Sequence, residues 1–224
     1  MKRTYIPLLV LMMIAMIVIP PQQAKAQNVK GQSVGTAGVG VSLVGLLYSA
    51  VKNSVNSQAG ASLQLHSTPV LIGSYDYAIA DHFSLGGAFS YQQFSSDYVN
   101  YQYVNSNHDT VVASFTDVVK RINFGVRPLF HFGNTENFDP YFGARISYTN
   151  WSYSTNNPDR FYDLSSAYKF IGASPIKFQV LFGIHYFFGE MLGINTELAF
   201  GPSYYLMGGM SFKFGGVGGN APRK

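Results

Sequence analysis

The chain has 224 residues, no cysteine, 16% aromatic residues and only 12% charged residues, whereas ordinary soluble domains carry about 25% charged residues. The absence of cysteine excludes disulfide bonds and thiolate chemistry, and the low charge argues against a soluble enzyme. The formal net charge is +4, but part of it lies in an expected N-terminal leader, so it gives no reason to expect a nucleic-acid partner.

The first 26 residues have the pattern of an export signal. Lys2 and Arg3 form a basic start, Ile6–Ile19 is an apolar run of fourteen residues, and Ala24–Ala26 is a small-x-small cleavage site. The run is shorter than the about 20 residues that a spanning helix needs. We predict a signal peptide over residues 1–26, with an uncleaved anchor helix as the alternative. Since no cysteine follows the site, a lipid-anchored lipoprotein is not expected.

Eight later segments have the length of membrane-crossing strands, which need about 9–11 residues when tilted. Their connections alternate between long and short, which is typical of outer loops and periplasmic turns. The long connections are 49–67, 97–116 and 154–174, and the exception is the short outer turn at 201–203. The predicted strands are roughly Gly35–Leu47, Val70–Ile79, Phe83–Phe94, Val118–Phe132, Tyr141–Tyr153, Ile176–Phe187, Leu192–Phe200 and Ser203–Phe214.

Apolar and polar residues alternate along these segments. Between positions 118 and 132, for example, Phe124 and Val126 share one face, whereas Asn123 and Arg127 share the other. A period of two indicates strands, and an apolar face repeated on every strand favours lipid outside. The predicted fold is an all-β, eight-stranded antiparallel up-and-down transmembrane β-barrel over residues 27–214. A secreted sandwich is the alternative.

A short repeat supports this interpretation. Phe124–Arg127, Phe142–Arg145 and Phe182–His185 each place Phe and an aliphatic residue on the lipid face, and Gly and a base on the lumen face. Glycine leaves room for a long side chain of a neighbouring strand. An eight-stranded barrel is just wide enough for side chains to fill, so small and large inner residues are expected to interlock.

Aromatic residues gather near the strand ends, where amphipathic rings favour the headgroup zone of a bilayer. We expect an outer girdle of Tyr48, Phe94, Tyr98, Trp151, Tyr153 and Tyr204. The expected inner girdle is Phe83, Phe132, Phe142, Phe187, Phe212 and Phe214.

Residues 34–214 resemble the outer-membrane protein β-barrel domain family, with a plan similar to the small OmpX and OmpA-type barrels. The resemblance lies in Asp139–Gly143, Glu197–Pro202 and the closing Met210–Phe214. It implies a bacterial outer-membrane location, a monomer, outer-membrane lipid around the barrel, and periplasmic chaperones and the outer-membrane assembly machinery as partners during biogenesis. The assembly signal would be Met210, Phe212 and Phe214.

The segment 215–224 follows that last aromatic strand. Because it is Gly-rich and polar, it is expected to be a flexible periplasmic tail. It is too short for the peptidoglycan-binding domain that OmpA-like proteins append.

The predicted lumen has more bases than acids. If the turn after the strand 118–132 is centred on Glu136, Arg127 faces Arg145, and two like charges in a dry lumen need a bridging carboxylate. We predict that Glu197 or Asp76 supplies it. The main interpretation is a structural salt-bridge network that fills the barrel, and the alternative is a selective ion path. The inward charged residues are Asp76, Arg121, Arg127, Arg145, Lys177, Glu197 and Lys213.

Five histidines were considered as sites. His82, His131 and His185 fall near the periplasmic ends and could hold a transition metal, but hydrogen-bonded rim histidines are the favoured interpretation, with Glu197 as an alternative partner of His185. In the outer loops, His66 with Ser67 and His108 with Asp109 could serve a lipid-modifying enzyme. Nothing in their spacing requires it, so no catalytic, cofactor or metal site is predicted.

The outer segment Ser95–Tyr103 is rich in Tyr, Asn and Ser. This composition suits an adhesive surface that binds an extracellular ligand, and it equally suits a hairpin that extends the barrel above the membrane. The predicted function is a structural or surface-interaction role without catalysis or cofactor. The alternatives are an outer-leaflet lipid-modifying enzyme and a small solute pore.

Overall fold

The computed structural model describes residues 28–52, 62–104, 107–133, 135, 137–157 and 174–215. The predicted signal peptide at 1–26 and nearly all of the predicted tail at 215–224 lie outside these ranges. The elements are β1 (Gln32–Val41), α2 (Leu43–Lys52), β2 (Ser62–Ser67), β3 (Val70–Ala80), β4 (Phe83–Val104), β5 (Thr110–His131), β6 (Phe138–Thr155), β7 (Ile176–Phe187), β8 (Leu192–Phe200) and β9 (Leu206–Gly215).

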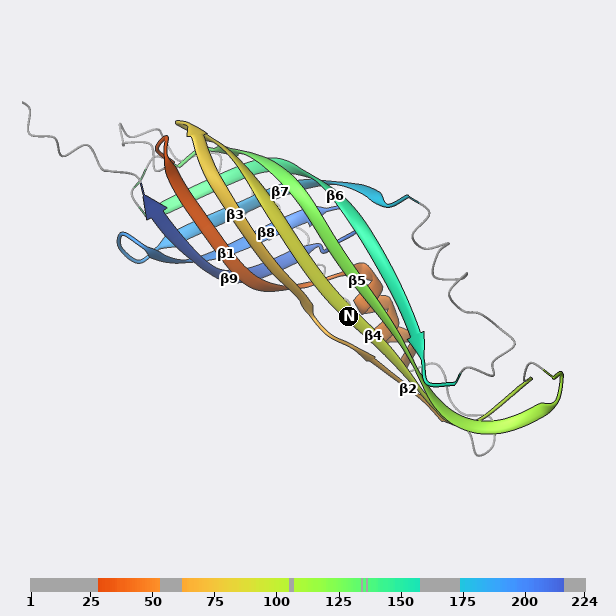
Figure 1. Ribbon diagram of the computed structural model, residues 1–224. Helices are drawn as coiled ribbons and strands as arrows, with labels where there is room; N and C mark the ends of the chain where they lie inside the picture. Colours follow the sequence, from red (N-terminus) through yellow and green to blue (C-terminus); the bar gives the residue numbers. More distant parts are fainter. Residues whose placement is uncertain are drawn as a thin grey trace, which may run out of the picture.

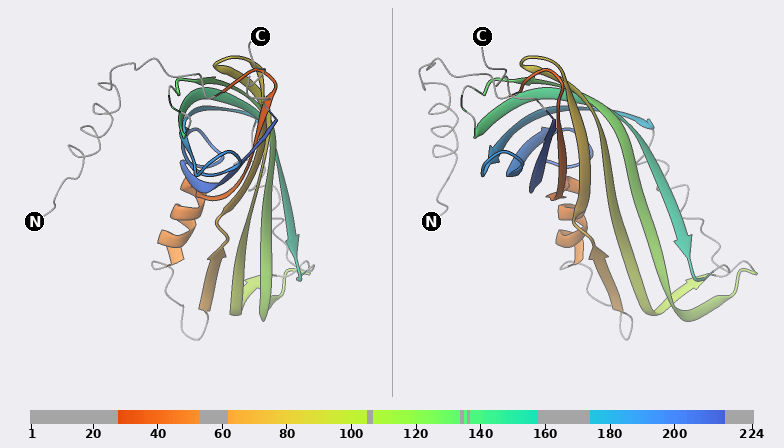
Figure 2. Two further views of the ribbon diagram at one scale, coloured as in Figure 1. Left: turned by 90° about the vertical axis from the view of Figure 1, so that its left-hand side faces the viewer. Right: turned by 60° about the vertical axis from the view of Figure 1, so that its left-hand side comes forward.

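Eight of the nine described strands close into a barrel, as predicted. Each strand pairs antiparallel with its neighbour in the order β1-β3-β4-β5-β6-β7-β8-β9, and β9 returns to pair with β1. Figure 1 shows the tilted strands, and the left view of Figure 2 looks nearly along the barrel. Closure leaves the eight barrel strands without a free edge at membrane height, which a sheet in lipid requires.

The outer side of the barrel differs from the expectation. The first strand ends at Val41 instead of Leu47, and the helix α2 follows it. The Ser42 hydroxyl accepts a hydrogen bond from the Gly45 N–H at 3.0 Å, the contact that caps a helix start. Alternation predicts a strand for the apolar residues from Leu43 to Leu47, but their spacing suits a helix equally well.

The segment 97–116 is largely strand and not an irregular loop. β4 and β5 each run for 22 residues and stay paired out to Val104 and Thr110. The short strand β2 lies within the segment predicted as the first long loop and pairs with this outer part of β4. The hairpin alternative for Ser95–Tyr103 is therefore confirmed, and Figure 1 shows the hairpin extending far beyond the barrel.

The two faces of the barrel wall have opposite character. Outward side chains are large and exposed, including Phe124 at 57%, Phe178 at 58% and Phe200 at 61%. The inward face is largely polar and buried, with a smaller apolar cluster around Leu129 and Leu181. No helix in the described ranges is long and apolar enough to cross a membrane.

Inward glycines make room for large neighbours, as predicted. A Cβ on Gly183 would lie 2.2 Å from Cζ of Tyr141, and one on Gly86 would lie 2.0 Å from Oδ1 of Asp76. Any larger residue would therefore push a lumen side chain out of its place.

The prediction of aromatic girdles is wrong for three residues. Phe94, Phe187 and Tyr204 are 3%, 0% and 0% exposed, so they point inward and cannot contact headgroups. Trp151 stacks on Phe94 at 6.3 Å between ring centroids. Phe94, Phe187 and Trp151 share the parity of the lumen face on their strands, whereas Tyr204 lies in the connection between β8 and β9.

Candidate functional site

The centre of the lumen contains a buried ion-pair cluster. The Arg127 guanidinium lies between two carboxylates, with Nε 3.1 Å from Oδ1 of Asp76 and Nη2 2.9 Å from Oε2 of Glu197. These three side chains, from β5, β3 and β8, are at most 3% exposed. The single base thus connects three strands across the interior, and both carboxylates that we considered as bridges reach it.

Arg145 forms a second level of the same cluster. The pairs Val126–Ile146 and Leu129–Gly143 set the register of β5 and β6, which places Arg145 opposite Arg127. Arg145 donates to Gln179 Oε1 and, at 3.3 Å, to the Tyr204 hydroxyl, and its Cζ lies 4.6 Å from the Tyr204 ring centroid. Like charges are therefore separated by polar and aromatic groups.

Glu197 is the acceptor that joins the two levels. Tyr141 donates its hydroxyl to Oε2 of Glu197 at 2.7 Å, and Tyr204 donates to Oε1. Together with Arg127, these contacts give both carboxylate oxygens a partner. A buried carboxylate with this many donors is held in one position.

Two of the other predicted inward bases, Lys177 and Lys213, lie outside this cluster. Lys177 is half-buried near the outer end of β7, opposite Ser147. The Lys213 ammonium lies 3.9 Å from the centroid of the Phe187 ring. The side chains proposed as the assembly signal, Met210, Phe212 and Phe214, are 47%, 38% and 47% exposed on β9.

A further polar layer lies toward the periplasmic end and contains two of the predicted histidines. His131 donates from Nδ1 to Oδ2 of Asp139 at 2.9 Å, and its Nε2 is 2.9 Å from the Ser84 hydroxyl. His185 Nδ1 lies 3.8 Å from the same Asp139 oxygen, so Asp139 and not Glu197 is the carboxylate paired with His185.

The third histidine does not join this group as a ligand. His82 sits in the β3–β4 turn with a positive φ of 66° and donates from Nδ1 to the His131 carbonyl at 3.1 Å. In the described part of the chain, no group of three His, Asp or Glu side chains has the arrangement of a metal site. His82 and His131 match the predicted hydrogen-bonded histidines, whereas both ring nitrogens of His185 are buried without a hydrogen-bond partner among the described residues.

Arg121 closes the outer mouth of the lumen. It donates to the carbonyls of Pro202 and Ser203 at 3.0 and 2.6 Å, and to Gln92 Oε1 at 2.7 Å. Its Cζ lies 5.5 Å from the Trp151 ring. Arg121 thereby ties the short β8–β9 turn on one wall to β4 on the other.

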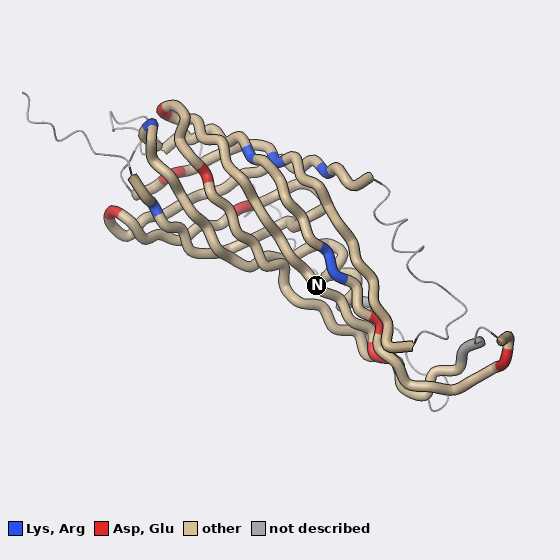
Figure 3. The backbone as a smooth tube through the Cα atoms, in the orientation of Figure 1, with Lys and Arg blue, Asp and Glu red and all other residues tan. Residues whose placement is uncertain are grey.

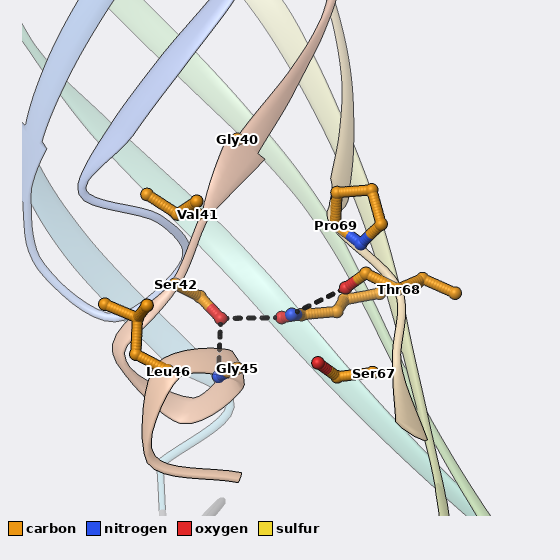
Figure 4. Close-up of a pocket in the computed structure, with 9 residues that line it drawn as sticks. Gly40, Val41, Ser42, Gly45, Leu46, Ser67, Thr68 and Pro69 are labelled. Atoms are coloured by element: carbon orange, nitrogen blue, oxygen red, sulfur yellow. Dashed lines mark hydrogen bonds between the residues drawn. The ribbon is translucent and has the colours of Figure 1, made fainter. Parts of the chain in front are cut away.

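Gln92 connects this mouth to helix α2. Gln92 accepts from the Ser42 hydroxyl at 2.8 Å and donates to the Thr68 carbonyl at 3.1 Å. Beside it lies a cavity of about 120 Å³ between the start of α2 and the β2–β3 connection, shown in Figure 4. On the helix, Tyr48 contacts the Ser96 hydroxyl, and burial raises the pKa of the Tyr48 phenol.

Sequence reasoning missed several residues of this site. Asp139 and Tyr141 lie on the same face of β6 as Arg145, which is the lumen face. The sequence pattern places Asp139 in a predicted turn, and it includes Tyr141 only in a motif of the family resemblance. Gln92 and Tyr204 are uncharged, so a search for inward charges passes over them, and it also omits Gln179, although strand parity places Gln179 on the lumen face. Parity extended over the whole of β4, β6 and β7 would have found all but Tyr204, which lies outside a strand.

The residues considered for outer-rim catalysis are spread over the extension. His66 lies on β2 with Nε2 3.5 Å from Oδ2 of Asp97, and both side chains are partly exposed. Ser67 is the next residue on the same strand, so the two side chains point to opposite faces. His108 and Asp109 lie at the hairpin turn.

A closed barrel with an apolar outer wall and a polar, packed interior defines an outer-membrane β-barrel protein. Residues 85–212 match the profile of the Opacity family porin protein. The chain belongs to this family, and its place is the bacterial outer membrane.

The chain is also similar to solved structures of outer-membrane proteins. OprG from Pseudomonas aeruginosa matches at 14% identity and a TM-score of 0.49, over 86% of this chain and 100% of OprG. The N-terminal barrel domain of Pseudomonas aeruginosa OprF matches at 14% identity and 0.40, over 83% and 98%. Ail from Yersinia pestis matches at 11% identity and 0.40, over 83% and 100%. A comparison with curated protein sequences gives no match.

Proposed function

We propose that this protein is a closed, non-conducting outer-membrane barrel that holds an extracellular β-sheet as an interaction surface. The observation that carries the proposal is the length of β4 and β5, which have 22 residues each. Crossing the membrane takes about 9–11 residues. About half of each strand is therefore available outside the membrane.

The packed lumen supports the closed part of the proposal. Arg121, Arg127 and His131 occupy successive levels of the interior, and each is at most 3% exposed. A water-filled pore would leave such side chains solvated. The name of the family includes the word porin, but this packed lumen favours a closed barrel that supports the extracellular sheet over an open channel.

The described surface of the extension suggests the chemistry of a partner. Tyr98 and Tyr101 pack around the buried ring of Phe115, with Tyr98 stacked on Phe115 at 4.5 Å between ring centroids and Tyr101 edge-on to both rings. Asp97 and Asp109 add negative charge, and Figure 3 shows acidic residues along this end of the molecule. Tyrosine with acidic neighbours favours a basic protein surface as the ligand.

Closure is tested by planar-bilayer recordings of the purified, folded protein. The expected result is no stepwise conductance, with a water-filled barrel of similar size as the positive control. Reproducible single-channel steps from the wild-type protein would contradict closure and favour the small solute pore.

Surface interaction is tested with a truncated hairpin. Tyr98 pairs with Phe115, so residues 99–114 can be replaced by Asn-Gly, which forms a two-residue hairpin turn. Protein in phospholipid nanodiscs is then titrated with cytochrome c as a basic protein probe. We expect the truncation to weaken binding at least tenfold. Equal binding by both forms would refute a role for residues 99–114, which include Tyr101 and Asp109.

The lipid-modifying enzyme is the second candidate because His66 has a carboxylate 3.5 Å away in Asp97. Its test is the mass spectrum of lipid A from cells that express wild-type protein or His66→Ala. We expect identical spectra, and an added or lost acyl chain that depends on His66 would establish the enzyme instead.

A further inference from the structure

Helix α2 presents a row of exposed leucines beside the barrel wall. Leu43, Leu46 and Leu47 are 48%, 55% and 56% exposed, and we call them the leucine face. Their spacing of three and four residues places them on one side of the helix. The opposite side is occupied, because Gly45 lies against Gln92 and Tyr48 packs on Phe94 with 5.4 Å between ring centroids.

The position of α2 relative to the membrane follows from the outward residues of the strands β4 and β5. Toward the outer end of β5, these residues change from apolar at Phe124, which is 57% exposed, to charged at Lys120. On β4 they change from Phe89 to Gln93. Because the lipid-facing wall must be apolar, the outer edge of the hydrocarbon lies near the paired residues Gln92 and Arg121.

Ser42 fixes the start of α2 at this same level. Its hydroxyl donates to Gln92 Oε1 at 2.8 Å and accepts from the Gly45 N–H at 3.0 Å. The leucine face therefore begins at the outer boundary of the membrane, and it extends for about 6 Å along the helix axis from Leu43 to Leu47, at about 1.5 Å per residue.

The leucine face is also continuous with the lipid-facing wall. Val39 and Val41 on β1 are 52% and 45% exposed, and they lead directly into Leu43. Figure 4 shows Val41 and Leu46 on the side of the segment away from Thr68. We propose that the leucine face is a lipid-binding surface that packs against acyl chains at the top of the outer leaflet, so that α2 anchors the barrel mouth in the membrane.

Lipid at this position explains why the three leucines of α2 are exposed. Three adjacent leucines in water would be an exposed apolar patch of the kind that marks an interaction site. An apolar helix face at the boundary of headgroups and acyl chains is covered by lipid without any further partner.

The chain has no cysteine, so single-cysteine variants give a direct test. Leu46→Cys and, separately, Leu47→Cys are labelled with a polarity-sensitive fluorophore and folded into phosphatidylcholine vesicles. Val39→Cys is the lipid-facing control, and Val112→Cys, on the distal hairpin and 65% exposed, is the water-facing control. A heat-dependent gel shift verifies folding of each variant.

We expect phosphatidylcholine brominated near the top of its acyl chains to quench the Leu46→Cys and Leu47→Cys labels at least half as strongly as the Val39→Cys label. Iodide in the water should quench them several-fold less than the Val112→Cys label. Labels that iodide quenches as strongly as the Val112→Cys label would overturn the proposal. Labels shielded from both quenchers would also overturn it, and would indicate that a second copy of the chain covers the helix.

Discussion

Replacing Arg127 by Met should be among the most damaging single changes in this protein. The substitution removes the base that lies 3.1 Å from Asp76 and 2.9 Å from Glu197, and both carboxylates are at most 3% exposed. Removing one partner of a buried ion pair costs about 3–5 kcal/mol because a charge remains uncompensated. Tyr141 and Tyr204 still donate to Glu197, so we expect a loss of about 3–5 kcal/mol for the cluster as a whole.

The assay is urea unfolding in phospholipid vesicles, followed by the fluorescence of Trp151, the only tryptophan of the chain. The matched variant is Arg127→Met with Asp76→Asn and Glu197→Gln, which removes all three charges together. Because neutral replacement of a buried ion pair is often close to neutral for stability, this triple variant should recover most of the loss. A single variant as stable as wild type, or a triple variant no better than the single, would refute the reasoning.

Three further predictions concern other parts of the barrel. Gly183→Ala should lose about 1–3 kcal/mol in the same unfolding assay, because its Cβ would overlap Tyr141, whereas Gly73→Ala, with its nearest neighbour 3.9 Å away, should change little. Arg121→Met should cost less than the loss of Arg127, since its described hydrogen-bond partners are neutral oxygens; an equal cost would contradict this. Ser42→Ala should weaken the α2 cap by about 1 kcal/mol, which faster tryptic cleavage after Lys52 would reveal and unchanged cleavage would contradict.

Strand parity predicted the barrel and the charged residues that face inward, because successive side chains of a strand point to opposite faces. A turn centred on Glu136 also predicts that Arg127 faces Arg145, and the register of β5 and β6 confirms it. Contacts across the lumen are different, since they depend on shear and on side-chain reach. For that reason, the two carboxylates of Arg127 could be named only as alternatives.

Helix α2 escaped prediction because its apolar residues fit two patterns. Leu43, Leu47 and Val51 are compatible with strand alternation as well as with helical spacing, and the decisive signal is Ser42 at the cap. The sequence supports the outer hairpin only as one of two alternatives, for another reason. Its Tyr, Ser and Asn residues are common in loops, and the pairing of β4 with β5 out to Val104 and Thr110, with a register shift between Tyr98 and Tyr101, distinguishes the hairpin.

The length of the packed interior explains why a barrel of this size can be closed throughout the membrane. Arg121, Arg127 and His131 lie on β5 within ten residues, which is about 33 Å of strand. At the usual tilt of about 35–45°, this corresponds to roughly 25 Å along the barrel axis, the height of the apolar band of an outer-membrane barrel. Each level is held by hydrogen bonds to at least one other strand or turn. Opening a path would therefore require separate breaks at all three levels, so the proposed closure depends on the whole alternating pattern and not on one gate.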